Sequence, residues 1–516
     1  MRKKAARRGS MGPAATVGLM AVLVLFLVAG ATGALAQSGR TLTVLVPAEF
    51  PHLDPSEVVS GDQYMVKYHI YNRLYTFNEK MEPLPDLVVK DSVSKDGTTW
   101  TFDLRPNVKF HDGSACDAEA VKYTVERMMK GTGNQKALFS MIKEVQVKSP
   151  TRVVMVTNGL FPALRNNLAH PDAAIVPPAA DQKLGKNFGK QPVGAGPYKF
   201  VEWLSGDHLT VVRNEQYYGA KPYFEKIEFK FVPDATTRVL MIDAGQADVA
   251  LRLPPSDIPK LKANKKVQIS QVMGRNIYFA LNNVKAPFTD IRVRHAVNYA
   301  VDKQAICDKV LFGAATPSHS LVEAVNYTIN AGFYAYDPNK AKALLKEANA
   351  VGAKVVLMTP VNRYMLDSEV AQAVAGYLRE AGLDVEVKAV GDFPSFTDMV
   401  RRGEFSMHML GWGGSTGDPD NAFRIQLHSN NAGKIWNGGS YKNPKVDQLI
   451  EAGAKEFDLK KRAKIYADVQ KVVWEDAPWL FLHRLSIFNA SKSEIQGIVL
   501  LPGTEMPYFW LAKRGS

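Results

Sequence analysis

The chain has 516 residues with a formal net charge of +13, and 46% of its residues are hydrophobic. This length exceeds what one hydrophobic core usually holds, so we expect two or three domains. Lysines and arginines are interspersed with acids rather than gathered into a basic stripe, which argues against a nucleic-acid partner. The two cysteines and ten scattered histidines form no zinc motif, and we expect no cofactor.

The first 36 residues have the pattern of a secretory signal peptide. A basic start, MRKKAARR, precedes an apolar run from Val17 to Ala29, and Ala34-Leu35-Ala36 offers the small residues that a signal peptidase recognises. The apolar run is interrupted before it reaches the roughly 18 residues that a membrane anchor needs. We expect cleavage to release a soluble periplasmic protein that begins at Gln37 and does not insert into the membrane.

The next segments alternate strand and helix patterns. Residues 41–46 predict a strand, and DQYMVKYHIY at 62–71 predicts an amphipathic helix that contains Tyr64. Strand patterns in TTWTFDL and EVQVKS flank a helical pattern that Asp117 is suited to cap. Further strands are expected in HLTVVR, KIEFKFV and NIYFALN, with a helix in DATTRVLMIDAG.

Cys116 and Cys307 lie at apolar positions, where a buried free cysteine behaves as a small hydrophobic side chain. One disulfide is also compatible with an oxidising compartment. The sequence leaves open whether the two thiols are free.

Strands and helices alternate most regularly between about residues 282 and 479. Helical patterns begin at Asp337-Pro338, in DSEVAQAVAGYLREAG and in PSFTDMVRRG, and strand patterns occur in KVVLM, LDVEVKAV and FSMHML. This alternation predicts a mainly parallel sheet with right-handed crossovers. The loops 359–366 and 411–420 then leave the carboxyl ends of strands at one edge of the sheet, where open α/β sheets bind ligands.

Four long segments carry a resemblance to a known family. They are LVVKDSVSKDGTTWTFDLRPNVKFHDGSACDAEAV, PVGAGPYKFVEW, RNEQYYGAKPYFEKIEFKFVPDATTRVLMIDAGQADVA and IRVRHAVNYAVDKQAI, and they occur in order along the mature chain. They resemble landmark segments of family 5 extracytoplasmic solute-binding proteins, which serve ABC importers for peptides, glutathione, nickel and related solutes. GWGGSTGDPDNAF is most similar to the glutathione-binding branch, in which a tryptophan is followed by Ser-Thr-Gly.

The resemblance implies an α/β, two-lobed periplasmic binding protein fold of the class II type. Mixed sheets flanked by helices would form two lobes joined by a hinge, with an extra subdomain in lobe 1. We expect lobe 1 to comprise 37–75, 191–281 and 480–516, its extra subdomain 76–190, and lobe 2 282–479. Such a receptor is not an enzyme; it closes on a small-molecule ligand, docks on a membrane ABC permease, and is expected to be a monomer.

A hydrolase is the alternative interpretation, because Gly413 to Gly417 fits the G-x-S-x-G pattern with Ser415 as the nucleophile of a secreted serine hydrolase. His428 and His483 follow in an order that a catalytic triad allows. Against this, Asp418-Pro419 is a turn signal that should delay the helix expected after such a serine, and no H-G-G-G-type oxyanion loop lies upstream.

A ligand-binding loop is the favoured interpretation of the same segment. In peptide-binding members of the family, the loop tryptophan lines the pocket, and the residue three places later is often an aspartate that holds the peptide's α-ammonium. Trp412 matches the tryptophan, whereas Ser415 replaces the aspartate and offers only a hydroxyl. Thr416 belongs to the same loop, and Asp418 with Asp420 would compensate for the missing charge only if the loop folds differently.

Arg363 lies where dipeptide-binding relatives carry an arginine that grips the ligand's carboxylate, and its planar guanidinium suits that contact. Arg275 and Asn276, at the expected first crossing between lobes, and Tyr64 are further candidates. The resemblance therefore implies a carboxylate-bearing organic solute that is peptide-, glutathione- or amino-acid-derivative-like. A nickel or haem carrier of the same family is an alternative, because the fold alone does not determine the ligand.

Overall fold

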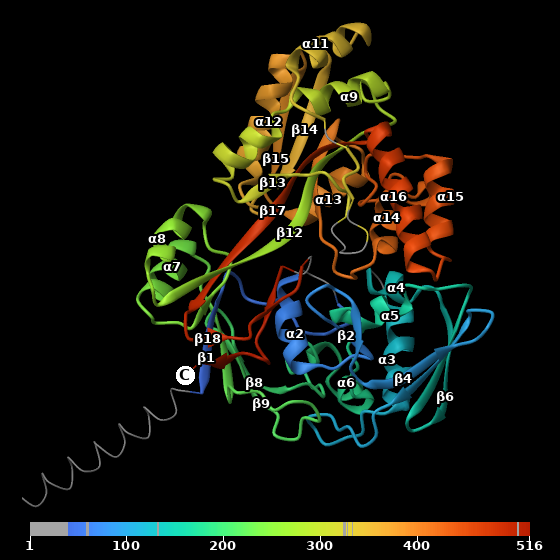
Figure 1. Cartoon of the computed structure of the whole chain (residues 1–516), viewed down its shortest axis with the longest axis vertical. Coiled ribbons are helices and arrows are strands. Elements are labelled where there is room, and N and C mark those ends of the chain that lie inside the picture. Colours follow the sequence, from blue (N-terminus) through green and yellow to red (C-terminus); the bar gives the residue numbers. More distant parts are fainter. Residues whose placement is uncertain are drawn as a thin grey trace, which may run out of the picture.

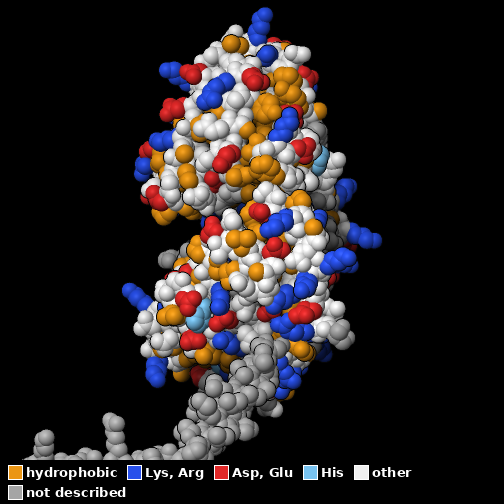
Figure 2. All heavy atoms as spheres, turned by 90° about the vertical axis from the view of Figure 1, so that its left-hand side faces the viewer, with side chains coloured by type: hydrophobic (Ala, Val, Ile, Leu, Met, Phe, Trp, Pro, Cys, Tyr) orange, Lys and Arg blue, Asp and Glu red, His pale blue; other side chains and the backbone are white. Residues whose placement is uncertain are grey.

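The computed structural model describes residues 40–57, 61–131, 134–322, 327, 329–332, 334–502 and 505–515. The expected signal peptide lies outside the described residues. Within these ranges, no helix has the length and apolar character needed to cross a membrane. Two lobes lie one above the other in Figure 1, and two long strands run between them. On the face shown in Figure 2, basic and acidic side chains are interspersed.

One mixed sheet of eleven strands extends through both lobes. Its order is β15-β14-β16-β12-β17-β11-β1-β10-β9-β8, with β13 paired to β17. The two long strands are β12 (Val267–Leu281) and β17 (Trp479–Lys492), which pair antiparallel from Val267↔Lys492 to Ala280↔Trp479. The register of this ladder shifts between Met273 and Asn276 and again between Ile277 and Tyr278. Because the two strands span both lobes, any rotation of one lobe against the other has to bend or twist them.

Lobe 1 is built on the strands beyond β17. In β10, alternate residues Ile227, Phe229 and Phe231 are buried, as expected for a strand with one face toward a core. The strands of this part are β1 (Thr41–Val46), β8 (Tyr198–Leu204), β9 (His208–Arg213), β10 (Lys226–Phe231), β11 (Val249–Ala250), β18 (Ile495–Gln496), β19 (Val499–Leu500), β20 (Pro507–Tyr508) and β21 (Lys513–Arg514). Its helices are α2 (Tyr64–Ile70), α7 (Ala235–Asp243) and α8 (Ile258–Ala263). The helix α6 (Pro178–Leu184) lies in the range expected for the extra subdomain, but its Ala180 and Leu184 pack against this core.

A separate antiparallel sheet, in the order β4-β5-β7-β6, forms the extra subdomain. The carboxylate of Asp117 accepts hydrogen bonds from the backbone N–H groups of Glu119 and Ala120, which confirms the predicted cap of α3. The elements are β2 (Tyr75–Phe77), β3 (Pro83–Pro85), β4 (Val88–Val93), β5 (Thr99–Leu104), α3 (Ala118–Lys130), α4 (Asn134–Phe139), β6 (Ile142–Ser149), β7 (Arg152–Thr157) and α5 (Leu164–Ala169).

Lobe 2 covers its part of the sheet with helices on both faces. Buried side chains of α9, α11 and α12 form one core, and those of α13 to α16 form another. The elements are α9 (Ile291–Ala300), α10 (Lys303–Ala305), β13 (Ala315–Pro317), α11 (Pro338–Glu347), β14 (Lys354–Pro360), α12 (Asp367–Ala381), β15 (Asp384–Val390), α13 (Phe393–Arg401), β16 (Met407–Trp412), α14 (Pro419–Leu427), α15 (Pro444–Gly453) and α16 (Leu459–Asp476).

The two cysteines lie in different cores. Cys116 is buried in the extra subdomain and Cys307 in lobe 2, and both are free thiols. Burial raises the pKa of Cys307 to about 12. Each therefore acts as a small apolar side chain in its core.

Candidate functional site

The two predicted ligand loops leave the same edge of the lobe 2 sheet. β14 and β16 are parallel, with Leu357 opposite Met407, so the loops that follow them emerge side by side. The backbone N–H of Gly411 donates a hydrogen bond to the hydroxyl of Tyr364 over 2.9 Å, which ties one loop to the other. The prediction that alternating strands and helices would bring these loops together is confirmed.

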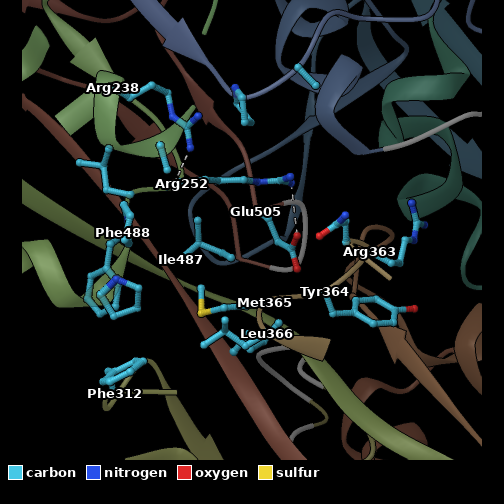
Figure 3. A pocket seen from close by; sticks show the side chains of 18 of the residues that line it. Arg238, Arg252, Phe312, Arg363, Tyr364, Met365, Leu366, Ile487, Phe488 and Glu505 are labelled. Carbon is cyan, nitrogen blue, oxygen red and sulfur yellow. Dashed lines mark hydrogen bonds and ion pairs between the residues drawn. The ribbon is translucent and has the colours of Figure 1, made fainter. Parts of the chain in front are cut away.

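A cavity of about 710 Å³ lies between the lobes at this edge. Lobe 1 contributes residues 252–256 and Asp62, lobe 2 contributes residues 362–366, and the long strands contribute Arg275 and Ile487. Figure 3 shows that polar side chains and apolar side chains occupy different parts of its wall. A volume in this range suits a small organic molecule.

Ion pairs hold two of the cavity's arginines. Arg275 donates to Glu505 through Nε at 2.7 Å and Nη2 at 2.8 Å, and Arg252 lies 2.6 Å from a carboxylate oxygen of Asp62. Burial alone would raise the pKa of Glu505, but the Arg275 guanidinium outweighs burial and lowers that pKa to about 2. These charges are therefore balanced within the protein.

The two other cavity arginines differ in what engages them. The guanidinium of Arg238 donates to four backbone carbonyls, those of Val232, Pro233, Leu251 and Arg252. The guanidinium of Arg363 lies over the ring of Phe393, 4.4 Å from its centroid, and is largely exposed. Among the described residues, no carboxylate or carbonyl pairs with the Arg363 guanidinium. The hydrogen-bonding capacity of the Arg363 guanidinium is therefore left for a ligand, whereas Arg252 is already paired with Asp62, although its Nε has no partner among the described residues.

Four of the remaining candidates line a second and much smaller cavity, of about 10 Å³, and none of them lines the first. Trp412, Ser415, Thr416 and Asp418 line it, and Trp412 packs edge-on against Trp436 at 5.4 Å. Asn276 is paired with Trp412 in the register of β12 and β16. Its side chain is buried, accepting from the Ser318 hydroxyl at 3.1 Å and donating to the Ser320 carbonyl at 3.3 Å.

The loop after β16 also makes direct contacts with lobe 1. The Ser415 hydroxyl lies 3.2 Å from Nε2 of His170, and the Thr416 carbonyl accepts a hydrogen bond from Asn166 at 3.0 Å. Gly417 has φ +63, and a Cβ there would lie 2.4 Å from the carbonyl oxygen of Met81. The two lobes are thus in contact at this loop.

His170 is part of a buried polar cluster that the sequence did not reveal. Its neighbour Asp172 accepts from Lys67 at 2.7 Å and from the hydroxyl of Tyr64 at 3.2 Å. Nδ1 of His170 accepts the backbone N–H of Asp172 at 3.2 Å, so we assign the proton to Nε2. Burial lowers the pKa of His170 to about 4, which keeps the ring neutral at neutral pH.

This geometry bears directly on the hydrolase alternative. Asp172, His170 and Ser415 do lie next to one another. In the tautomer that we assign, Nε2 of His170 donates toward Ser415 and is not placed to accept the serine proton. His428, in contrast, contacts Glu451 at 3.3 Å, and His483 is buried on β17. Neither of the histidines that the sequence offered takes the role of general base to Ser415 among the described contacts.

One argument from the sequence against the hydrolase is wrong. Asp418-Pro419 does not delay a helix: α14 begins at Pro419, and Asp418 caps it by accepting the N–H of Asp420. Proline suits the first helical position because its missing N–H has no partner there. The buried carboxylate of Asp418 also accepts from Arg462 at 2.5 and 2.9 Å. Asp418 is therefore engaged within the protein.

Within the described part of the chain, no group of three or more histidine, cysteine, aspartate or glutamate side chains is arranged to hold a metal ion. His170 and Glu505 were missed in the sequence because each has partners far away in the chain. No local spacing links Ser415 to His170 or Arg275 to Glu505.

Comparisons with known proteins agree with this arrangement. The model of the bacterial extracellular solute-binding proteins, family 5 middle region, matches residues 82–434. The glutathione-binding protein GsiB of Pectobacterium atrosepticum is 31% identical over 496 residues, covering 92% of this chain and 95% of that protein. Among solved structures, HbpA2 from Haemophilus parasuis is similar with a TM-score of 0.81 and 25% identity, covering 92% of this chain and 100% of that one. AgaA from A. tumefacien R10, in complex with agropinic acid, has a TM-score of 0.80 and 25% identity, covering 92% and 99%.

Proposed function

This chain belongs to family 5 of the bacterial extracellular solute-binding proteins, receptors of ABC importers, and we propose that it captures a carboxylate-bearing organic solute between its lobes. Arg363 is the observation that carries this proposal. It lines the cavity between the lobes, and no carboxylate or carbonyl among the described residues engages its guanidinium. A planar guanidinium binds a carboxylate through two parallel hydrogen bonds.

The loop after β16 supports an anion-selective site. Ser415 provides no negative charge for a ligand ammonium, and the nearby carboxylates of Asp172 and Asp418 are paired with Lys67 and Arg462. The imidazole of His170, which contacts Ser415, is neutral and also adds no negative charge. A solute acceptor group is therefore better matched to this side of the site than a solute ammonium.

The relatives suggest which solutes to test first. Glutathione carries two carboxylates, and the agropinic acid in the AgaA complex is also an organic acid. A peptide-, glutathione- or amino-acid-derivative-like solute therefore fits both the relatives and the uncompensated Arg363.

The protein acts as a monomeric receptor in the periplasm, where the mature chain begins at Gln37 and presents its solute to a membrane permease. We assign it no catalytic residue, since the histidine next to Ser415 carries its proton on the nitrogen that faces the serine. Stoichiometric labelling of Ser415 by a fluorophosphonate, absent in Ser415→Ala, would contradict this assignment.

Mass spectrometry of the solute released from denatured protein identifies the ligand class, and calorimetry with derivatives tests the anchor. For glutathione as the probe, N-acetylation should change the affinity little, whereas the dimethyl ester should bind about ten-fold or more weakly. The reason is that esterification removes the charge that Arg363 binds. If acetylation costs more affinity than esterification, the carboxylate is not the main anchor.

A further inference from the structure

Backbone strain is concentrated around the cavity. Ten residues other than glycine have positive φ in the described chain, and five of them line it. These five are Arg252 (φ 51), Phe312 (φ 51), Asn362 (φ 58), Leu366 (φ 50) and Glu505 (φ 62). Residues with a Cβ rarely adopt this conformation, and positions held in it often serve binding. Arg252 and Glu505 make ion pairs there, but Phe312 and Leu366 are apolar.

A phenylalanine at position 312 is unfavourable both for the backbone conformation and for the exposure of its side chain to water. It has a left-handed backbone, and its side chain is 61% exposed although it is a large hydrophobic residue. A glycine or asparagine would adopt the same turn with less strain, and a polar residue would suit water better. Packing of the protein core therefore does not explain a phenylalanine at this position.

Leu366 is the second apolar residue in such a position. It is the N-cap of α12 with φ 50 and ψ 40, and its side chain makes no capping hydrogen bond. Serine, threonine, aspartate or asparagine is the usual choice for an N-cap. The leucine packs in part against the lobe 2 core and also contributes to the cavity wall, three residues after Arg363.

These side chains lie on one side of the cavity. Figure 3 shows Phe312 and Phe488 facing Leu366 and Ile487, while Arg252, Glu505 and Arg363 border the polar side. All of them line the same cavity, so the apolar side is continuous with the arginine that we assign to the carboxylate.

We propose that the apolar side, walled by Phe312, Leu366, Ile487 and Phe488, binds a hydrophobic group of the solute. The protein then selects organic acids that carry an apolar substituent over wholly polar ones. This inference rests on the proposed function, because it takes the solute carboxylate to be held by Arg363 and the rest of the solute to lie along the apolar side. Burial of the substituent against Phe312 supplies the extra affinity.

Calorimetry with glutathione and S-hexylglutathione tests this inference, because the two probes have the same charged groups and differ in one apolar chain. Wild type should bind S-hexylglutathione at least about ten-fold more tightly. Phe312→Ala should lose this preference, so that its affinities for the two probes become similar. Leu459→Ala, which truncates an exposed apolar residue of α16 that is 63% exposed and does not line the cavity, should behave as wild type.

Equal affinity of wild type for the two probes, or a preference that persists in Phe312→Ala, overturns the inference. Arg363→Ala distinguishes a failure of this inference from a failure of the proposed function. This variant should bind both probes more weakly, by the same factor. If wild type binds both probes equally and Arg363→Ala still weakens binding, only the apolar compartment is contradicted. If Arg363→Ala binds both probes as wild type does, the proposed carboxylate anchor is contradicted.

Anilinonaphthalene sulfonate, an anion with aromatic rings, extends the test beyond peptides. Its fluorescence should rise on binding to wild type and to Leu459→Ala, and this rise should be much smaller with Phe312→Ala. If neither this probe nor S-hexylglutathione binds wild type, the apolar compartment does not exist as a binding site.

Discussion

Glu505 shows how one buried carboxylate connects the end of the chain to the long strands. It accepts three hydrogen bonds from Arg275, two from the guanidinium and one from the backbone N–H at 3.0 Å. A second arginine, Arg252, lies with its Nη2 3.7 Å from a carboxylate oxygen of Glu505. The attraction of these arginines for the carboxylate outweighs its loss of hydration, so its pKa falls to about 2.

This depressed pKa predicts a pH dependence of stability. Because the folded pKa is below the usual 4.5, ionised Glu505 adds to the free energy of unfolding at neutral pH, and this contribution is lost as the pH falls from about 4.5 to about 2. The shift corresponds to about 3 kcal/mol. We expect Glu505→Gln to reduce the free energy of unfolding at pH 7 and to flatten its decline in this acid range.

Urea unfolding at pH 7, 4 and 3 measures this effect. Glu494→Gln removes a half-exposed carboxylate that pairs with Arg514 and serves as the control. An acid-induced loss of stability that is the same in Glu505→Gln and wild type would show that Glu505 does not carry it.

Individual site residues could be predicted from the sequence only where the family resemblance indicated their position. Arg363 was identified in this way, and the structure puts it in the cavity. His170 could not be found, since its role depends on a contact with Ser415 across the two lobes. Local sequence patterns carry no information on such pairs.

At the scale of elements, periodicity and caps predicted most helices and strands of lobe 2. The helix closed by Gly382 and the helix that begins at Pro338 are present with these ends. NIYFALN predicted only the last part of β12, which extends back to Val267. The earlier residues of this strand mix buried, intermediate and exposed sites without regular alternation, so they show neither an apolar run nor the two-residue period of a strand.

The β16–α14 loop gives a prediction about lobe closure. Gly417→Ala places a Cβ against the Met81 carbonyl of lobe 1, so it should oppose the contact between the lobes. Gly403→Ala is the matched control, because Gly403 has φ +67 and nothing lies within 4 Å of its would-be Cβ. Both variants carry similar backbone strain, and only one carries the clash.

Small-angle scattering with and without solute measures the closure. Wild type and Gly403→Ala should become more compact when solute bridges the lobes, and Gly417→Ala should do so less. Identical scattering curves for the two alanine variants would mean that the Met81 contact does not limit closure.

At the scale of the molecule, the sequence indicated an α/β protein, and the resemblance indicated two lobes. The two-lobed fold is confirmed by similarity to solved binding proteins over most of the chain. The single sheet through both lobes was not predicted. It depends on pairing of β12 with β17, which lie far apart in the chain, and neither strand's own pattern identifies its partner.

The central claim is that the cavity between the lobes binds a solute carboxylate through Arg363. Calorimetry with the solute recovered from the purified protein tests it on Arg363→Ala, Arg363→Lys and, as a control, Arg401→Ala, which removes an exposed arginine of α13. A hydrogen-bonded charge contributes about 1.5–3 kcal/mol, so Arg363→Ala should bind roughly ten- to a hundred-fold more weakly, with incomplete rescue by lysine. Wild-type affinity in Arg363→Ala would contradict the account.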